Sequence, residues 1–227
     1  MKKILTFVIA AALCSQAFGW GGVGHRTIVE IAQRNLTEKA KQNISKYMNY
    51  DLKKEAVWMD THRKDEPIAY TTAWHVYNID ENSVYDPNPR LYKGDCIHAL
   101  KIADYNLSKY EQLTDSAVVM NLRMLLHFVG DMHCPVHIVF PKDIHPSPNI
   151  HNNGKKVNYH TFWDTSLGHD GRQNKWPYEK ISSVIDTLSE EEIKQIQSGE
   201  LLDWAKEIAK IVEGDLYDWG KDSATAS

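Results

Sequence analysis

The stretch His127-Phe128-Val129-Gly130-Asp131-Met132-His133-Cys134-Pro135-Val136-His137 places three histidines and one aspartate within eleven residues. His127 and Asp131 are four residues apart, so on a helix their side chains leave the same face one turn from each other. Pro135 cannot continue such a helix, and we therefore expect His137 to follow a break. The spacing allows two ligands to reach one ion, and it predicts the centre of a metal site.

The residues before this stretch predict the helix that carries it, over 115–133. Apolar residues recur at helical spacing nearly all round this segment, which predicts that the helix is buried. A charged Asp131 at its buried end is costly without a partner, and a metal is a partner that also uses the histidines. Gly130 costs about 1 kcal/mol relative to alanine inside a helix, which indicates that another group approaches its backbone closely.

Helical spacing recurs along the rest of the chain, and long alternating strand patterns are absent. We therefore predict an all-α fold, with a single compact helical domain over residues 20–227. Further helices are expected at 26–34, 38–47, within 51–65, and at 95–110, 159–167, 189–198 and 201–219. The residues of 80–94 and of 141–156 are rich in turn-forming types and predict irregular segments, the second a long exposed loop.

Residues 1–19 are typical of a secretory signal peptide. Met1-Lys2-Lys3 is a basic start, a short apolar run follows, and Ala17-Phe18-Gly19 places small residues at the expected cleavage point. We therefore predict an exported protein, periplasmic or extracellular, that begins at Trp20. A lipoprotein reading centred on Cys14 is the weaker alternative, because Leu13 is large where a small residue is expected.

The remaining sequence predicts no membrane span, because no later segment approaches the length of apolar chain that a bilayer requires. Loss of Lys2 and Lys3 with the signal peptide changes the formal net charge from −4 to −6. That balance argues against electrostatic capture of duplex nucleic acid, unless bound cations supply positive charge locally. Cys96 and Cys134 remain after processing, and the sequence leaves open whether they pair.

Distant segments supply further candidate ligands. His160 and Asp164 repeat the four-residue spacing of His127 and Asp131 on a second expected helix. The other candidates are Asp60, His75 and His137. Histidine nitrogen combined with carboxylate oxygen suits zinc, whereas ions that prefer all-oxygen shells do not fit this mixture.

Several pieces of the sequence occur in an order that resembles a known family. They are Trp20-Gly21-Gly22-Val23-Gly24-His25, Trp58-Met59-Asp60, Trp74-His75, the 127–137 stretch, Asn158-Tyr159-His160-Thr161-Phe162-Trp163-Asp164 and Trp204-Ala205-Lys206-Glu207. The ordered set resembles the zinc-dependent single-strand nuclease family of the fungal S1/P1 type, with zinc phospholipase C as a more distant fold relative. The resemblance implies an all-α domain of the phospholipase C and single-strand nuclease type around a trinuclear zinc site.

The resemblance also implies which residues hold the three zinc ions. The first ion would be held by Asp60, His75, His127 and Asp131, and the second by His137, His160 and Asp164. The third would be held by the amino group and carbonyl oxygen of Trp20, by His25, and by Asp131 as a bridge. Cleavage before Trp20 creates that amine, which must lose its proton to bind. His133 matches no ligand position, and we expect it to pack or to support its neighbours.

The implied activity is that of a zinc-dependent endonuclease, which cleaves single-stranded DNA or RNA to 5′-phosphorylated products, with 3′-nucleotidase activity left open. Asp60 would orient the attacking water, and Arg63 would contact the phosphate or support Asp60. The expected partners are single-stranded nucleic acid or nucleotides, with no stable protein partner and a monomeric chain. A zinc-dependent phospholipase C-like phosphodiesterase is the alternative, but the sequence shows no exposed basic amphipathic helix for a lipid surface.

Three positions depart from the family pattern. Val76 follows His75 where the fungal enzymes carry a base-stacking aromatic residue, and Tyr77 is the candidate to replace that residue. The 143–154 loop offers Asn152-Asn153-Gly154 in place of a Gly-Gly-Asn run, so Asn152 and Asn153 are the other candidate substrate contacts. Cys134 stands where glutamine is usual. These departures leave the base preference open.

Overall fold

The computed structural model describes residues 20–49, 51–87, 94–141, 149–152, 155–166 and 175–213. Most of these residues lie in helices, which confirms the prediction of an all-α fold. The same part of the chain also contains two small two-stranded sheets, which the sequence pattern did not indicate. None of the helices in this part of the chain is both long and apolar enough to span a lipid bilayer.

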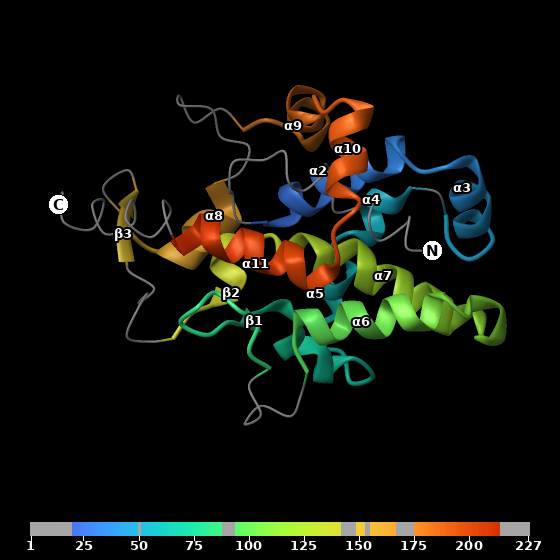
Figure 1. The fold of residues 1–227 in the computed structure, drawn as a ribbon, viewed down its shortest axis with the longest axis horizontal. Helices are drawn as coiled ribbons and strands as arrows, with labels where there is room; N and C mark the ends of the chain where they lie inside the picture. Colours follow the sequence, from blue (N-terminus) through green and yellow to red (C-terminus); the bar gives the residue numbers. More distant parts are fainter. Residues whose placement is uncertain are drawn as a thin grey trace.

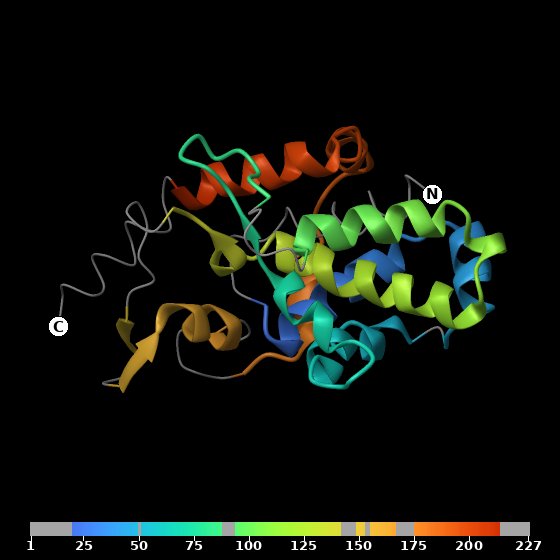
Figure 2. The same cartoon turned by 90° about the horizontal axis from the view of Figure 1, so that it is seen from below.

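The helices α6 (Cys96–Leu107) and α7 (Asp115–Met132) pack side by side at the centre of the fold (Figures 1 and 2). The Thr114 hydroxyl caps α7 by accepting the Ala117 N–H, and the Asp95 carboxylate caps α6 by accepting the His98 N–H. Every residue of α7 from 124 to 132 is buried, as the sequence predicted. The end of α7 therefore lies in the interior of the protein.

The N-terminal helices surround one side of α7. α2 (Gly22–Arg34) contacts α7, α4 (Leu52–Glu55) and α9 (Tyr178–Ile185), a helix that the sequence did not predict. α3 (Glu38–Ser45) starts at the predicted Thr37 cap. α5 (Trp58–His62) packs against α7, so the 51–65 segment forms two short helices where one was expected. α2 also begins four residues earlier than the sequence suggested.

A short parallel ladder follows two of the candidate ligands. η1 (Ala69–His75) leads into β1 (Tyr77–Asn78), and η3 (Pro135–His137) leads into β2 (Ile138–Val139). The two strands pair in the register Tyr77↔Ile138 and Asn78↔Val139. The predicted break at Pro135 is present, and the ladder holds the ends of η1 and η3 beside each other.

The remaining elements lie around this centre. β3 (Asn149–Asn152) pairs antiparallel with β4 (Lys155–Asn158), so part of the expected 141–156 loop is a hairpin, and β4 leads into α8 (Tyr159–Ser166). η2 (Tyr110–Gln112) joins α6 to α7. α10 (Glu190–Ile196) begins with the predicted Ser189–Glu192 capping box. α11 (Leu201–Ile211) runs along the outside (Figure 2), and its predicted extension to 219 lies partly beyond the described residues.

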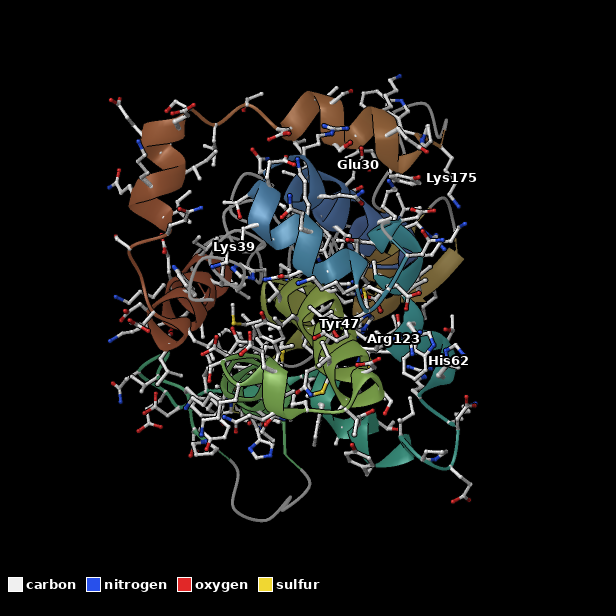
Figure 3. All side chains as sticks on the ribbon, turned by 90° about the vertical axis from the view of Figure 1, so that its right-hand side faces the viewer. Glu30, Lys39, Tyr47, His62, Arg123 and Lys175 are labelled. Atoms are coloured by element: carbon white, nitrogen blue, oxygen red, sulfur yellow. The ribbon has the colours of Figure 1, made fainter. Side chains whose placement is uncertain are left out.

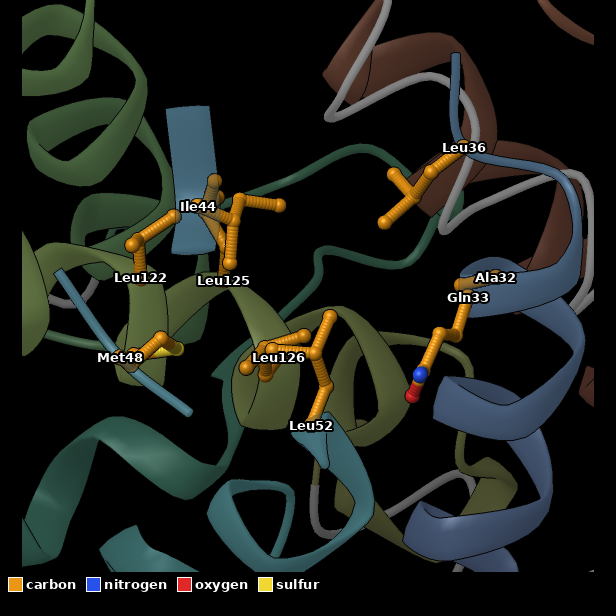
Figure 4. Close-up of a pocket in the computed structure, with 9 residues that line it drawn as sticks. All are labelled: Ala32, Gln33, Leu36, Ile44, Met48, Leu52, Leu122, Leu125 and Leu126. Atoms are coloured by element: carbon orange, nitrogen blue, oxygen red, sulfur yellow. The ribbon is translucent and has the colours of Figure 1, made fainter. Parts of the chain in front are cut away.

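A small apolar cavity lies between α2, α3, α4 and α7 (Figure 4). Its volume is about 20 Å³, and its lining residues are Ala32, Gln33, Leu36, Ile44, Met48, Leu52, Leu122, Leu125 and Leu126. A lining of this kind offers few hydrogen-bond partners to a water molecule. The neighbouring helices therefore fill this region incompletely.

We predict that Leu122→Ala lowers the free energy of unfolding by about 2–5 kcal/mol, because the truncation enlarges a space that the surrounding side chains cannot fill. Leu122 is buried and lines this cavity. Urea unfolding of the two proteins measures the difference. Leu202 on α11 has an exposed fraction of 42%, and Leu202→Ala as the control should change stability by no more than about 0.5 kcal/mol. Equal losses in the two variants would contradict this account of the core.

Candidate metal centre

The carboxylate of Asp131 is surrounded by four imidazole rings from four elements. Oδ2 lies 2.9 Å from Nδ1 of His75 and 3.1 Å from Nε2 of His127. Oδ1 lies 2.9 Å from Nδ1 of His137 and 3.4 Å from Nε2 of His25. Asp131 and His127 are both fully buried. One buried carboxylate is therefore the meeting point of α2, η1, α7 and η3.

Two of these ring nitrogens also face each other. Nε2 of His127 lies 3.1 Å from Nδ1 of His75, and each nitrogen lies 3.7 Å from Oδ1 of Asp60. Nδ1 of His127 lies 2.8 Å from the Ala56 carbonyl oxygen and can donate its proton to it, which leaves Nε2 as the nitrogen that would bind a metal after losing its proton. Lone pairs that converge with two carboxylates in this way suit a divalent cation.

Several buried polar atoms of this cluster have no hydrogen-bond partner among the residues that the structure describes. They are both ring nitrogens of His25, Nε2 of His75, Oδ1 of Asp131, Nδ1 of His137 and Oδ1 of Asp164. Some of these atoms lie close together but lack the angles of a hydrogen bond, as Asp131 and His137 do. Buried polar atoms without partners are costly, and coordination to a metal would satisfy them. The donor set therefore fits metal ions.

A second, more open group adjoins the first. Oδ1 of Asp164 lies 3.7 Å from Nε2 of His137, and Oδ2 lies 3.2 Å from Nε2 of His160. The two imidazole rings stack with their centroids 4.9 Å apart. The exposed fractions of the His160 and Asp164 side chains are 40% and 30%. His137 therefore links the groups, with Nδ1 directed at Asp131 and Nε2 at Asp164.

Three sets of possible ligand atoms lie within 4.8 Å of one another in the described part of the chain. They are His25, His127 and Asp131; Asp60, His75 and His127; and Cys134, His137 and Asp164. The first two sets share His127, and His137 of the third set contacts Asp131. These histidine and aspartate groups are arranged so that they can bind metal.

Two glycines allow the close packing of these groups. A Cβ atom on Gly130 would lie 2.8 Å from Nδ1 of His25, so His25 can contact α7 there only because residue 130 has no side chain. This confirms the close approach that the sequence indicated at Gly130. A Cβ atom on Gly21 would collide with the backbone carbonyl of Asp164. The segment that begins at the buried Trp20 therefore lies against α8.

A stack of side chains fixes α5, which carries Asp60, to α7. The Arg123 guanidinium lies 4.1 Å from the centroid of the Trp58 ring, and the ring of His62 stacks on the indole with centroids 4.2 Å apart. Figure 3 labels Arg123 and His62 on this side of the protein. Nε of Arg123 also donates a hydrogen bond to Glu55 at 2.6 Å. Cation–π contacts stabilise by about 0.5–2 kcal/mol, so this stack helps to position Asp60.

The electrostatics of the cluster keep Asp131 ionised. Burial alone would raise its pKa, but the neighbouring His127 and His137 hold the pKa well below its usual range. Burial likewise opposes protonation of His137, whereas Cys134 and Asp131 raise its pKa well above the usual value. Burial and the adjacent His127 lower the pKa of His25. Asp131 is thus available as an anionic ligand.

The structure brings together the predicted side-chain ligands His25, Asp60, His75, His127, Asp131, His137, His160 and Asp164. Trp20 lies beside them, with its backbone N–H hydrogen-bonded to the Cys134 thiol. Their roles as ligands stay predictions.

Arg63, the predicted phosphate contact, is exposed at the end of α5. Its backbone carbonyl accepts a hydrogen bond from the Thr72 hydroxyl, and no described acidic residue forms an ion pair with its guanidinium.

The expectation that Tyr77 stacks on a base is wrong. Its ring is fully buried on β1, and its hydroxyl donates to the Ala205 carbonyl at 3.3 Å. No ring face remains for a substrate, because the same strand that follows His75 is paired with β2 in the interior. Of the two other predicted substrate contacts, Asn152 belongs to strand β3, and Asn153 lies outside the described residues.

Two further residues near the end of α7, His133 and Cys134, were not among the predicted ligands. Nδ1 of His133 lies 2.8 Å from the Val129 carbonyl, and burial lowers the pKa of this histidine to about 4, so the ring is neutral and packs as expected. Cys96 and Cys134 are free thiols. Sequence reasoning gave Cys134 no role, although it lies three residues before His137 and joins one of the ligand sets.

Comparison with known proteins gives consistent matches. A model of the S1/P1 nuclease family matches residues 20–227. The chain is 27% identical over 180 residues to Nuclease S1 of Aspergillus oryzae, across 74% of this chain and 61% of that protein. It is 28% identical over 162 residues to Nuclease P1 of Penicillium citrinum, with coverage of 65% and 58%. It is also 28% identical over 165 residues to Endonuclease 2 of Arabidopsis thaliana, with coverage of 66% and 56%. The matched region thus spans less than two thirds of each relative.

We predict that His127→Ala reduces the divalent metal retained by the purified protein at least tenfold, since changes to outer-shell partners alone cost about 10–100-fold in affinity. Elemental analysis after dialysis measures the bound metal. His98→Ala is the matched control, because His98 is an exposed histidine of α6 outside the ligand sets. The same metal content in both variants would rule out the His127 group as a metal site.

Proposed function

Because the chain belongs to the S1/P1 nuclease family, we propose that it is a zinc-dependent nuclease that hydrolyses phosphodiester bonds of single-stranded DNA or RNA. The observation that carries this proposal is the convergence of four imidazoles on the buried Asp131. Histidine and carboxylate donors suit zinc. Removal of phosphate from 3′-nucleotides is part of the same proposal, because it breaks the same kind of ester bond.

We assign three zinc ions to the cluster. The first would be held by Asp60, His75, His127 and Asp131, and the second by His137, His160 and Asp164. The third would be held by the N-terminus of Trp20, by His25 and by Asp131. Bound zinc would supply positive charge and Lewis acidity to the phosphodiester, which offsets the negative charge of the chain.

The chain's own residues would bind and orient the reactants around these ions. The Asp60 side chain has an exposed fraction of 38%, whereas Asp131 is fully buried, so Asp60 is the carboxylate of its group that solvent can reach. It can therefore accept a hydrogen bond from the attacking water and orient it toward phosphorus. Arg63, exposed near Asp60 at the end of α5, would donate hydrogen bonds to the phosphate. The same proposal includes cleavage that leaves the phosphate on the 5′ end of the product.

Export belongs to the same proposal. Residues 1–19 have the composition of a signal peptide, and cleavage after Gly19 would convert the Trp20 peptide nitrogen into an amine. That nitrogen lies beside Cys134, next to His137, so the new amine would form in the candidate centre. Processing would in this way complete the site only after the chain has left the cytoplasm.

We predict that the protein purified after export cleaves denatured DNA and RNA at least about tenfold faster than duplex DNA. A site that takes single strands can act on a duplex only after its base pairs open, and this opening costs free energy. A chelator should abolish the activity, and added zinc should restore it. Release of choline phosphate from lecithin, measured in parallel, tests the rival phospholipase activity. Lecithin cleavage without nucleic acid cleavage, or nuclease activity that survives metal removal, would overturn the proposal.

We also predict that residues retained ahead of Trp20 reduce bound zinc by one ion per chain, because an amide nitrogen lacks the lone pair that an amine donates. A form with Met-Ala before Trp20 and a form that begins at Trp20 can be compared by elemental analysis and by hydrolysis of denatured DNA. Mass spectrometry establishes each N-terminus. Equal zinc content and equal turnover would show that the amine is not a ligand.

A further inference from the structure

Cys134 lies at the junction between the end of α7 and η3, in the same interior as the candidate ligands. Its side chain is fully buried. Its sulfur, a nitrogen of His137 and a carboxylate oxygen of Asp164 all lie within 4.8 Å of one another. Three donor atoms gathered this closely could hold one metal ion after small side-chain adjustments.

We propose that the Cys134 sulfur is a further ligand of the metal ion held by His137, His160 and Asp164. The inference rests on the proposed metal centre and goes beyond it, because the sequence comparison assigned no role to this residue. It adds a sulfur donor to a group that otherwise holds two imidazoles and one carboxylate.

The other two donors of this set also face each other. His137 is more than nine-tenths buried, and its Nε2 lies 3.7 Å from Oδ1 of Asp164, whereas its Nδ1 is directed at Asp131. Oδ1 of Asp164 has no hydrogen-bond partner among the described residues. Sulfur, nitrogen and oxygen donors in one group match the mixed ligand sets of zinc. The unpartnered carboxylate oxygen of Asp164 therefore points to a ligand independently of the thiol.

The second thiol of the domain shows what a structural cysteine looks like in this fold. Cys96 is also fully buried, but its sulfur donates to the Phe128 carbonyl oxygen at 3.1 Å. It belongs to none of the possible ligand sets. The Cys134 sulfur accepts the N–H of Trp20 and lies within 4.8 Å of a nitrogen of His137 and a carboxylate oxygen of Asp164. The two cysteines therefore form a natural pair of test and control.

Binding would replace the thiol proton by the metal ion, and the proton would pass to solvent. With Cys134, the group has four protein donors, which is the number that closes a tetrahedral zinc shell. Structural zinc sites are closed, whereas catalytic sites keep an open position. A fourth protein donor would therefore make this ion more firmly held than three donors would.

Cobalt spectroscopy of the exported protein tests this ligand directly. Co²⁺ can occupy zinc sites, and a bound thiolate gives a near-ultraviolet charge-transfer band that histidine and carboxylate ligands lack. Cleavage of the signal peptide removes Cys14, so Cys96→Ser leaves Cys134 as the single cysteine of the exported protein. The metal-free protein is titrated with Co²⁺, and bound cobalt is counted by elemental analysis.

We expect the band in the parent and in Cys96→Ser, and its loss in Cys134→Ser and Cys134→Ala. Cobalt affinity of the Cys134 variants should fall about tenfold or more, given that changes to outer-shell partners alone cost this much. Cobalt bound without the band in Cys96→Ser would overturn the inference and leave the metal centre intact. No cobalt binding by the parent would overturn the metal centre as well. If the Cys134 variants fail to fold, the spectrum of Cys96→Ser still decides.

Discussion

The buried carboxylate of Asp131 is the constraint on which the arrangement of the whole domain depends. A single ionised group in an apolar interior requires compensation, and four imidazoles from α2, η1, α7 and η3 surround it. Gly130 lets His25 reach it, and the β1–β2 ladder holds the segments that follow His75 and His137 together. The long apolar surface of α7 keeps Asp131 in the core. Fold and candidate site are therefore built by the same contacts.

Solvent reaches the two halves of this cluster to different extents. Asp131 and His127 have no exposed surface, whereas Asp60, His160 and Asp164 are partly exposed. The buried half is suited to fixing positions and charge, and the exposed side chains are suited to meeting water and a phosphate. The Arg123–Trp58–His62 stack and the packing of Gly21 on Asp164 tie the exposed half to the rigid core.

Much of this was readable from local sequence signals. Four predictions each depended on a few neighbouring residues: the shared helix face of His127 and Asp131, the break at Pro135, the Ser189 capping box and the close approach at Gly130. The burial of Tyr77, the short parallel ladder and the helix α9 depend on contacts between distant segments, which no local pattern records. The position of Cys134 beside Asp164 is of the same kind: the two residues are thirty positions apart, and only folding brings them together.

Anomalous diffraction at the zinc absorption edge, from crystals of the protein purified after export, tests the central claim most directly. We expect three peaks: one between Asp131 and the His75–His127 pair, one beside His25 and the N-terminus, and one between His137 and Asp164. The absence of any peak within coordination distance of Asp131, with the four surrounding imidazoles hydrogen-bonded only to protein groups, would contradict the account.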